Sequence, residues 1–193
     1  RPSGNAGPLA TSFVGFRTYH EENAWTWEHL ALTRARVVLA DIGFGEKVED
    51  LIAGVLARPR DIEKTIDDVV AMRALMARER PPRHPYDLKL ATGGIVDLEF
   101  TAQTGQLVAG KTIDAPQATV ATVLGRMFDT GLLPEGERLV EIHGVYSTIL
   151  EVMSAALSDP FRDEGWTGAF RELLAQRTNR PNFARLSADI AEM

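Results

Sequence analysis

Apolar side chains recur at helical spacing through most of this sequence, and this periodicity limits the fold more than any other feature. Over residues 62–76 the apolar positions are four, three, three and four residues apart, as on one face of a helix. They are Ile62, Ile66, Val69, Met72 and Met76. From about residue 11 onward no stretch alternates convincingly at a period of two, as a half-buried strand would. The sequence therefore predicts an all-α helical bundle.

Turn and capping residues divide the chain into predicted helices. Ser12 or Thr11 can cap the first helix, Asp61 can cap the fourth, and proline or glycine interrupts the pattern between them. The predicted helices span residues 12–22, 23–41, 46–57, 61–80, 94–108, 114–131, 134–159 and 166–174. A polar tail around residues 179–182 follows the last of them.

The helix predicted over residues 23–41 has the most regular pattern of the N-terminal part. Its two tryptophans, Trp25 and Trp27, are expected in the core. Arg34 and Arg36 fall in its last turn, where cations interact favourably with the helix dipole. Glu28 has two interpretations that the sequence leaves open. It either forms a buried ion pair with one of these arginines or faces a ligand.

Composition excludes several classes of protein. The chain has 193 residues, is 45% hydrophobic and carries a formal net charge of −6, which fits a globular protein and argues against nonspecific binding of nucleic acid. It has no cysteine, which excludes a disulfide scaffold and Cys-ligated zinc and fits a reducing cytoplasm. No apolar run is long enough to span a bilayer, and no partner in a membrane is expected. The histidines lack a second histidine at i+3 or i+4 and are expected to pack rather than to ligate.

The segment over residues 87–103, DLKLATGGIVDLEFTAQ, combines a glycine pair with an acid-bearing helix start. Gly93 and Gly94 mark a break, Gly94 is expected near the N-cap, and Asp97 then falls in the first turn. Asp97 and Glu99, two residues apart, do not point the same way. A polar face carries Glu99, Gln103 and Gln106, and an apolar face carries Ile95, Leu98 and Ala102. On these residues alone the segment is a capped core helix with a solvated side.

Three stretches together carry a family resemblance. RPSGNAGPL at residues 1–9, AWTWEHLALTRAR at 24–36 and DLKLATGGIVDLEF at 87–100 closely resemble the glutamine synthetase adenylyltransferases. The resemblance implies a large enzyme with two nucleotidyltransferase halves, each a catalytic α/β domain followed by a helical domain. It also implies transfer of AMP from ATP to a tyrosine of glutamine synthetase with Mg²⁺, regulated by the PII signalling protein and glutamine. RPSG and AWTWEH resemble the C-terminal, adenylylating half.

The resemblance also implies a domain division. Residues 1–40 are expected to be the C-terminal remnant of the nucleotidyltransferase domain, and residues 41–193 the helical bundle. Nucleotidyltransferases of this kind hold two divalent ions with three carboxylates. Two belong to a Gly-Ser-x-Asp-x-Asp motif that is absent here, and the third is expected just before Arg1. The chain is therefore expected to be a piece without catalytic or metal-binding residues, to hold no cofactor tightly and to be inactive alone.

The residues that remain have implied roles in the parent enzyme. Cleft-lining or nucleotide-binding roles fall on Arg1, Ser3, Lys89, Gly93, Gly94, Asp97 and Glu99, and structural or interdomain roles on Trp25, Trp27, Glu28, Arg34 and Arg36. Arg1 and Lys89 are candidate phosphate contacts, and the acids would orient basic residues or ribose hydroxyls. Alternatively, Lys89, Asp97 and Glu99 tie the two domains together through ion pairs.

Two further functional alternatives stay open. The chain could belong to a PII-uridylyltransferase-like enzyme, which shares a similar segment of two glycines and an acid. It could also be a non-catalytic helical module that binds a partner protein.

Overall fold

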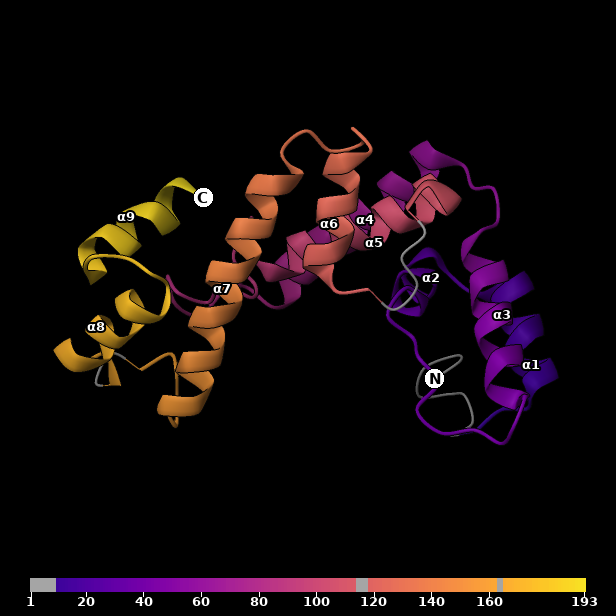
Figure 1. The fold of residues 1–193 in the computed structure, drawn as a ribbon, viewed down its shortest axis with the longest axis horizontal. Coiled ribbons are helices and arrows are strands. Elements are labelled where there is room, and N and C mark those ends of the chain that lie inside the picture. The colour runs from indigo at the N-terminus through magenta and orange to yellow at the C-terminus, as the bar shows by residue number, and fades with distance from the viewer. Residues whose placement is uncertain (1–9, 114–117, 163–164) are drawn as a thin grey trace.

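The computed structural model describes residues 10–113, 118–162 and 165–193. Every regular element in these ranges is helical, and they contain no strand, which confirms the all-helical prediction for this part of the chain. The helices are spread along the long axis of the molecule, with α8 and α9 at one end and α1 and α3 at the other (Figure 1). No helix within the described ranges is long and apolar enough to cross a membrane.

The elements follow one another with short connections. In chain order they are α1 (Phe13–Thr18), the π-helical turn η2 (Tyr19–Asn23), α2 (Thr26–Leu32), α3 (Phe44–Leu56), α4 (Ile62–Glu79), α5 (Ile95–Ala109), the 3₁₀ turn η3 (Gly110–Ile113), α6 (Val120–Asp129), α7 (Gly136–Ala156), α8 (Gly168–Arg177) and α9 (Phe183–Glu192). Ser12 and Asp61 cap α1 and α4 as predicted, each accepting the backbone N–H three residues later. Helix α9 was not predicted.

The largest core lies where the start of α5 meets α7, α8 and α9. Ile149 and Leu186 have no exposed surface, and the predicted apolar stripe of α7 supplies much of this core. Trp166, just before α8, stacks on Tyr86 with ring centroids 4.7 Å apart. A smaller core joins the end of α5 to α6, where Met127 packs against Gly105. These contacts fix α5, and with it the segment around the glycine pair.

The N-terminal part has a much smaller core, and the long helix predicted over residues 23–41 is wrong. Helix α2 ends at Leu32, and the Thr33 hydroxyl donates to the Leu30 carbonyl oxygen at 2.7 Å instead of continuing the helix. Residues 33–43 are irregular, and Val38, Leu39 and Ile42 are 85%, 93% and 107% exposed. Since a helix in water depends on packing its apolar face, these side chains, without a core to bury them, do not sustain one.

The apolar stripe predicted for α4 is correctly spaced but mostly not buried. Ile62 and Ile66 are exposed, and Thr65 is the one buried residue of the helix. The stripe is exposed because α4 packs against α2 and α5 along one side only and leaves the other open. The predicted polar face of α5 is also partly wrong, because Gln103 is buried.

Candidate functional site

The glycine pair turns the chain tightly into α5. Gly94 is the N-cap of the helix, as predicted. A Cβ atom on Gly94 would lie 2.3 Å from the Leu88 carbonyl oxygen, so only glycine fits there. Gly93 has a φ of 76°, a left-handed conformation that glycine adopts without strain. The turn and the helix start are therefore built as one unit.

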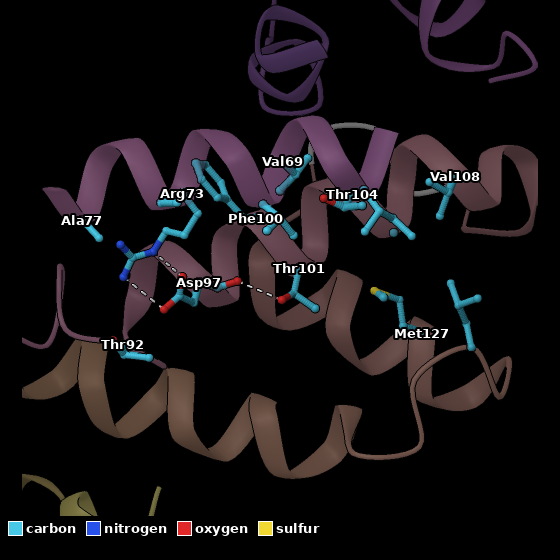
Figure 2. Close-up of a pocket in the computed structure, with 15 residues that line it drawn as sticks. Val69, Arg73, Ala77, Thr92, Asp97, Phe100, Thr101, Thr104, Val108 and Met127 are labelled. Atoms are coloured by element: carbon cyan, nitrogen blue, oxygen red, sulfur yellow. Dashed lines mark hydrogen bonds and ion pairs between the residues drawn. The ribbon is translucent and has the colours of Figure 1, made fainter. Parts of the chain in front are cut away.

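Arg73 of α4 holds this unit in place through a charged, hydrogen-bonded clamp. Its Nε donates to Asp97 Oδ1, and its Nη2 donates to Asp97 Oδ2 at 3.2 Å (Figure 2). The same Nη2 donates to the carbonyl oxygens of Leu90 and Ala91 at 3.1 and 3.2 Å. Asp97 Oδ2 also accepts the Gly93 N–H at 2.7 Å. Asp97 thus links α4, the turn and α5.

Arg73 was missed at the sequence level, although a signal was present. It lies four residues after Val69 and seven after Ile66, on the face that the apolar stripe occupies. A charged residue on such a face requires a partner when the face is packed. The side chains of Arg73 and Asp97 are only 17% and 28% exposed, which strengthens their pairing relative to a surface ion pair.

Glu99 points away from Asp97, as predicted, and pairs with a different part of the chain. Its Oε1 atom lies 2.8 Å from Arg34 Nη1. Arg34 belongs to the irregular stretch after α2, so this ion pair joins the N-terminal part to α5. The Arg34 side chain is more than half exposed, and the pair contributes little to stability in the isolated chain.

Lys89 differs from the acids of the same segment. It is exposed and forms no ion pair with any residue that the structure describes, so its ammonium group can bind an anion from outside. The backbone N–H groups of the glycine pair already have acceptors within the protein. Gly93 N–H is bonded to Asp97, and Gly94 N–H donates to the Ala91 carbonyl oxygen at 3.0 Å. Lys89 therefore presents an exposed cation beside the turn, whereas the acids of the segment are paired within the protein.

Glu28 is buried, but it does not pair with Arg34 or Arg36. It accepts the Tyr19 hydroxyl at 2.7 and 2.9 Å on its two oxygens, and it accepts the Trp25 N–H at 3.0 Å. The predicted ion pair is wrong because α2 ends before the arginines and carries them away from Glu28. Through these hydrogen bonds the Glu28 carboxylate caps the N-terminus of α2.

The tryptophans of this helix are not in the core, contrary to the prediction. Trp25 is 71% exposed and Trp27 is 48% exposed. The helix buries Glu28, Leu30 and Leu32 instead. Arg36 is exposed and forms no ion pair within the described ranges. Arg1 and Ser3 lie outside the described residues.

Two histidines of the N-terminal part, His20 and His29, pack together beside the partly buried Arg60. His29 Nε2 lies 3.0 Å from the His20 carbonyl oxygen, and His29 Nδ1 lies 3.1 Å from Arg60 Nη1. Burial lowers the pKa of both His20 and His29, and the nearby Arg60 guanidinium lowers the pKa of His29 further. His29 is held as the neutral tautomer that donates from Nε2. The two rings pack against each other and against Phe16, with ring centroids 6.0 Å apart for His20 and His29 and 4.5 Å apart for Phe16 and His20.

A groove of about 590 Å³ lies between α4 and α5 and extends to Met127 of α6. Figure 2 shows Arg73 and Asp97 toward one end and Val108 and Met127 toward the other. Most of its lining is apolar or small, and it consists of Ile66, Val69, Val70, Arg73, Ala74, Ala77, Thr92, Asp97, Phe100, Thr101, Thr104, Gly105, Val108, Met127 and Leu132. The groove is therefore suited to an apolar occupant.

The described residues do not provide a site for a divalent metal ion. They contain no group of three or more histidine, aspartate or glutamate side chains placed to hold one. Asp97 and Glu99, the acids nearest the candidate site, are each held by an arginine. The arrangement can orient a neighbouring group or bind a phosphate through Lys89, but Mg²⁺ does not fit it.

Comparison with known proteins finds similarity first to a class of enzymes, the adenylyltransferases. A family model described as glutamate-ammonia ligase adenylyltransferase matches residues 1–51. The chain is also 40% identical, over 195 aligned positions, to a bifunctional glutamine synthetase adenylyltransferase/adenylyl-removing enzyme of Brucella suis biovar 1. Enzymes of the same name from Bradyrhizobium diazoefficiens and Xanthobacter autotrophicus are 38% and 39% identical.

These matches cover the whole chain but only about 20% of each relative. They confirm the resemblance that the three sequence stretches carry. The chain is homologous, along its full length, to a segment of the glutamine synthetase adenylyltransferases.

Proposed function

We propose that this chain is the helical part of the adenylylating half of a glutamine synthetase adenylyltransferase. In the complete enzyme, AMP is transferred from ATP to a tyrosine of glutamine synthetase, under the control of PII and glutamine. Homology along the full length of the chain carries the proposal. The helical fold of the described residues agrees with it.

The surface of the N-terminal part supports the proposed division at about residue 40. Val38, Leu39 and Ile42 are almost fully exposed, Trp25 is 71% exposed and Phe44 is 45% exposed. Several exposed large apolar side chains within a short part of the sequence are typical of a segment that another part of a protein covers. We assign this surface to contact with the nucleotidyltransferase domain. Residues 1–51, which the family model matches, include all five of these side chains.

In this proposal the segment around the glycine pair forms one wall of the active cleft. Lys89 contacts a phosphate group, while Arg73 and Asp97 keep the turn that carries it rigid. Glu99 and Arg34 hold the N-terminal part against α5. Arg1 and Ser3 are proposed at the edge of the nucleotide site.

Divalent ions would neutralise the triphosphate and activate the attacking hydroxyl in an enzyme of this class. Because Asp97 and Glu99 are engaged by arginines, the ligands of these ions are proposed to come from outside this chain. The isolated chain is therefore expected to be inactive.

The direct test is incorporation of labelled AMP into glutamine synthetase. The chain alone, with ATP and Mg²⁺, should give no product, whereas the complete polypeptide should modify glutamine synthetase. Within the complete polypeptide, Lys89→Ala should raise the KM for ATP by about tenfold, the scale of one lost charged contact. Lys64→Ala is the matched control, because Lys64 is an exposed lysine of α4 that pairs with Asp68. Incorporation by the isolated chain would overturn the proposed origin of the metal ligands.

A helical docking module without chemistry is the second candidate, because both acids of the segment are engaged in internal ion pairs. An unchanged KM for ATP in Lys89→Ala, together with lost binding of a partner protein, would favour it. A uridylyltransferase would instead use UTP in place of ATP, and parallel assays with the two nucleotides distinguish these enzymes.

A further inference from the structure

We propose that the groove between α4 and α5 is an intramolecular docking site, filled by an apolar-faced helix from another part of the same polypeptide. The inference rests on the proposed function only in taking the chain as a piece of a longer enzyme. It concerns a surface separate from the proposed contact at residues 38–44.

The first observation is the open face of α4. Ile62, Ile66 and Val70 follow one another at intervals of four residues and are 51%, 45% and 62% exposed. Ile66 and Val70 line the groove, and Thr65 is the one buried residue in this helix of 18 residues. An amphipathic helix of this length is normally stabilised by packing its apolar face. Helix α4 thus lacks a neighbour along this face.

The second observation is the chemistry of the lining. Ala74 and Ala77 are small and exposed and leave room for the close approach of another helix, and the apolar side chains beside them suit its apolar residues. The Thr104 hydroxyl, in the wall of the groove, is buried and has no hydrogen-bond partner among the described residues, so the packing at this wall leaves one polar group unsatisfied.

The same chemistry excludes a nucleotide as the occupant. A triphosphate requires several cationic or N–H donors, and Arg73 is the one cation of the lining. Its Nε and Nη2 already donate to Asp97 and to two carbonyl oxygens. The charge of the clamp is therefore balanced within the protein, and the groove accepts an uncharged, apolar surface.

The source of that surface follows from the size of the relatives. The chain spans about 20% of their length, so most of their polypeptide lies outside the segment that it matches. A covalently linked helix binds at a high effective concentration and needs no large interface of its own. A groove of about 590 Å³ suits such a helix better than a separate protein, which would need a wider interface.

Hydrogen exchange of the complete polypeptide tests this inference. Amides 66–79 of α4 should exchange at least about tenfold more slowly in the complete polypeptide than in the isolated chain, because the docked helix suppresses local opening. Val70→Glu should remove this protection, and it should leave the unfolding midpoint of the isolated chain unchanged, since Val70 is exposed there. Leu173→Glu on α8, an exposed apolar position outside the groove, is the matched control and should keep the protection.

A photo-reactive benzoylphenylalanine in place of Val70 identifies the occupant. The expected product is a cross-link within one polypeptide to a helix outside residues 1–193. Equal exchange in the two proteins, or cross-links between two copies, would overturn the inference. AMP transfer measured on the same samples separates the two proposals. If AMP is transferred but α4 is not protected from exchange, the docking site is contradicted and the proposed function is not. If α4 is protected but no AMP is transferred, the proposed function is contradicted and the docking site is not.

Discussion

The two ends of the molecule differ in how completely they are packed. From α5 to α9 the helices surround a core in which Ile149 and Leu186 are fully buried. From residue 10 to residue 44 the chain buries few apolar side chains and exposes Val38, Leu39 and Ile42. Apolar residues at helical spacing are thus buried in one part of the molecule and exposed in the other. The difference agrees with the proposed contact between the N-terminal part and another domain.

The largest effect expected from this difference is on folding stability. Ile149→Ala should lower the free energy of unfolding by about 2–5 kcal/mol, because it opens a cavity in the main core. Leu39→Ala, at a position that is 93% exposed, should change it by less than about 0.5 kcal/mol. Urea denaturation of the isolated chain measures both. A loss of more than about 1 kcal/mol in Leu39→Ala would mean that residues 33–43 are packed in solution.

The next effect concerns the clamp that joins α4 to the glycine turn. Arg73→Ala should cost about 1.5–3 kcal/mol, the range for hydrogen bonds to a charged group, because it leaves Asp97 and two carbonyl oxygens without this donor. Hydrogen exchange at the Gly93 amide should accelerate in parallel, since that amide donates to Asp97.

Arg73→Lys is the control for charge. Lysine keeps the cation but lacks the planar fork that donates to Asp97 and to the carbonyl oxygens together. The free energy of unfolding of the Arg73→Lys variant should lie between those of the native chain and of Arg73→Ala. A value equal to that of the native chain would show that charge alone holds the turn.

The helical fold was predictable from the sequence because helical periodicity and capping are local properties. Ser12, Asp61 and Gly94 occupy the capping positions assigned from the sequence alone. Burial was less predictable, because periodicity shows which residues share a face and not whether a neighbour covers it. The exposed stripe of α4 and the exposed Trp25 and Trp27 are the two clearest cases.

The candidate site was predictable only in part. The segment from Lys89 to Glu99 and its glycine break were recognised from the sequence. The arginines that hold its acids come from positions 24 and 65 residues earlier in the chain. Such pairs depend on how helices pack, and neither α4 nor the stretch after α2 carries a local signal for them beyond one cation on an apolar face. Whether Arg1, Ser3 and Lys89 bind a nucleotide stays a prediction.

A smaller effect on folding stability is expected from replacing glycines, one in each of the two differently packed regions. Gly94→Ala should destabilise the chain by about 1–3 kcal/mol, because the new Cβ would contact the Leu88 carbonyl oxygen and force the turn apart. Gly54→Ala, in the interior of α3, should stabilise it by about 0.5–1 kcal/mol, since no atom lies within 4 Å and alanine favours helix. Thermal denaturation distinguishes the signs. Equal effects at both positions would contradict the tight turn.

The smallest effect expected is a dependence of folding stability on pH that arises from two histidines of the N-terminal part. Burial lowers the pKa of His20 and His29 below that of the unfolded chain, so the unfolded state binds more protons as the pH falls below about 6.5. Stability should therefore decrease from about pH 7.5 to about pH 5.5, where exposed carboxylates remain mostly ionised.

His29→Gln tests this origin, because glutamine can replace the hydrogen bond to the His20 carbonyl oxygen but does not titrate. Its urea midpoint should depend less on pH over this range than that of the native chain. His143→Gln provides the comparison in α7, where burial also lowers the histidine pKa but the nearby Glu99 carboxylate opposes the shift. If His143→Gln flattens the profile more than His29→Gln, the main core and not the N-terminal part controls the acid sensitivity of this chain.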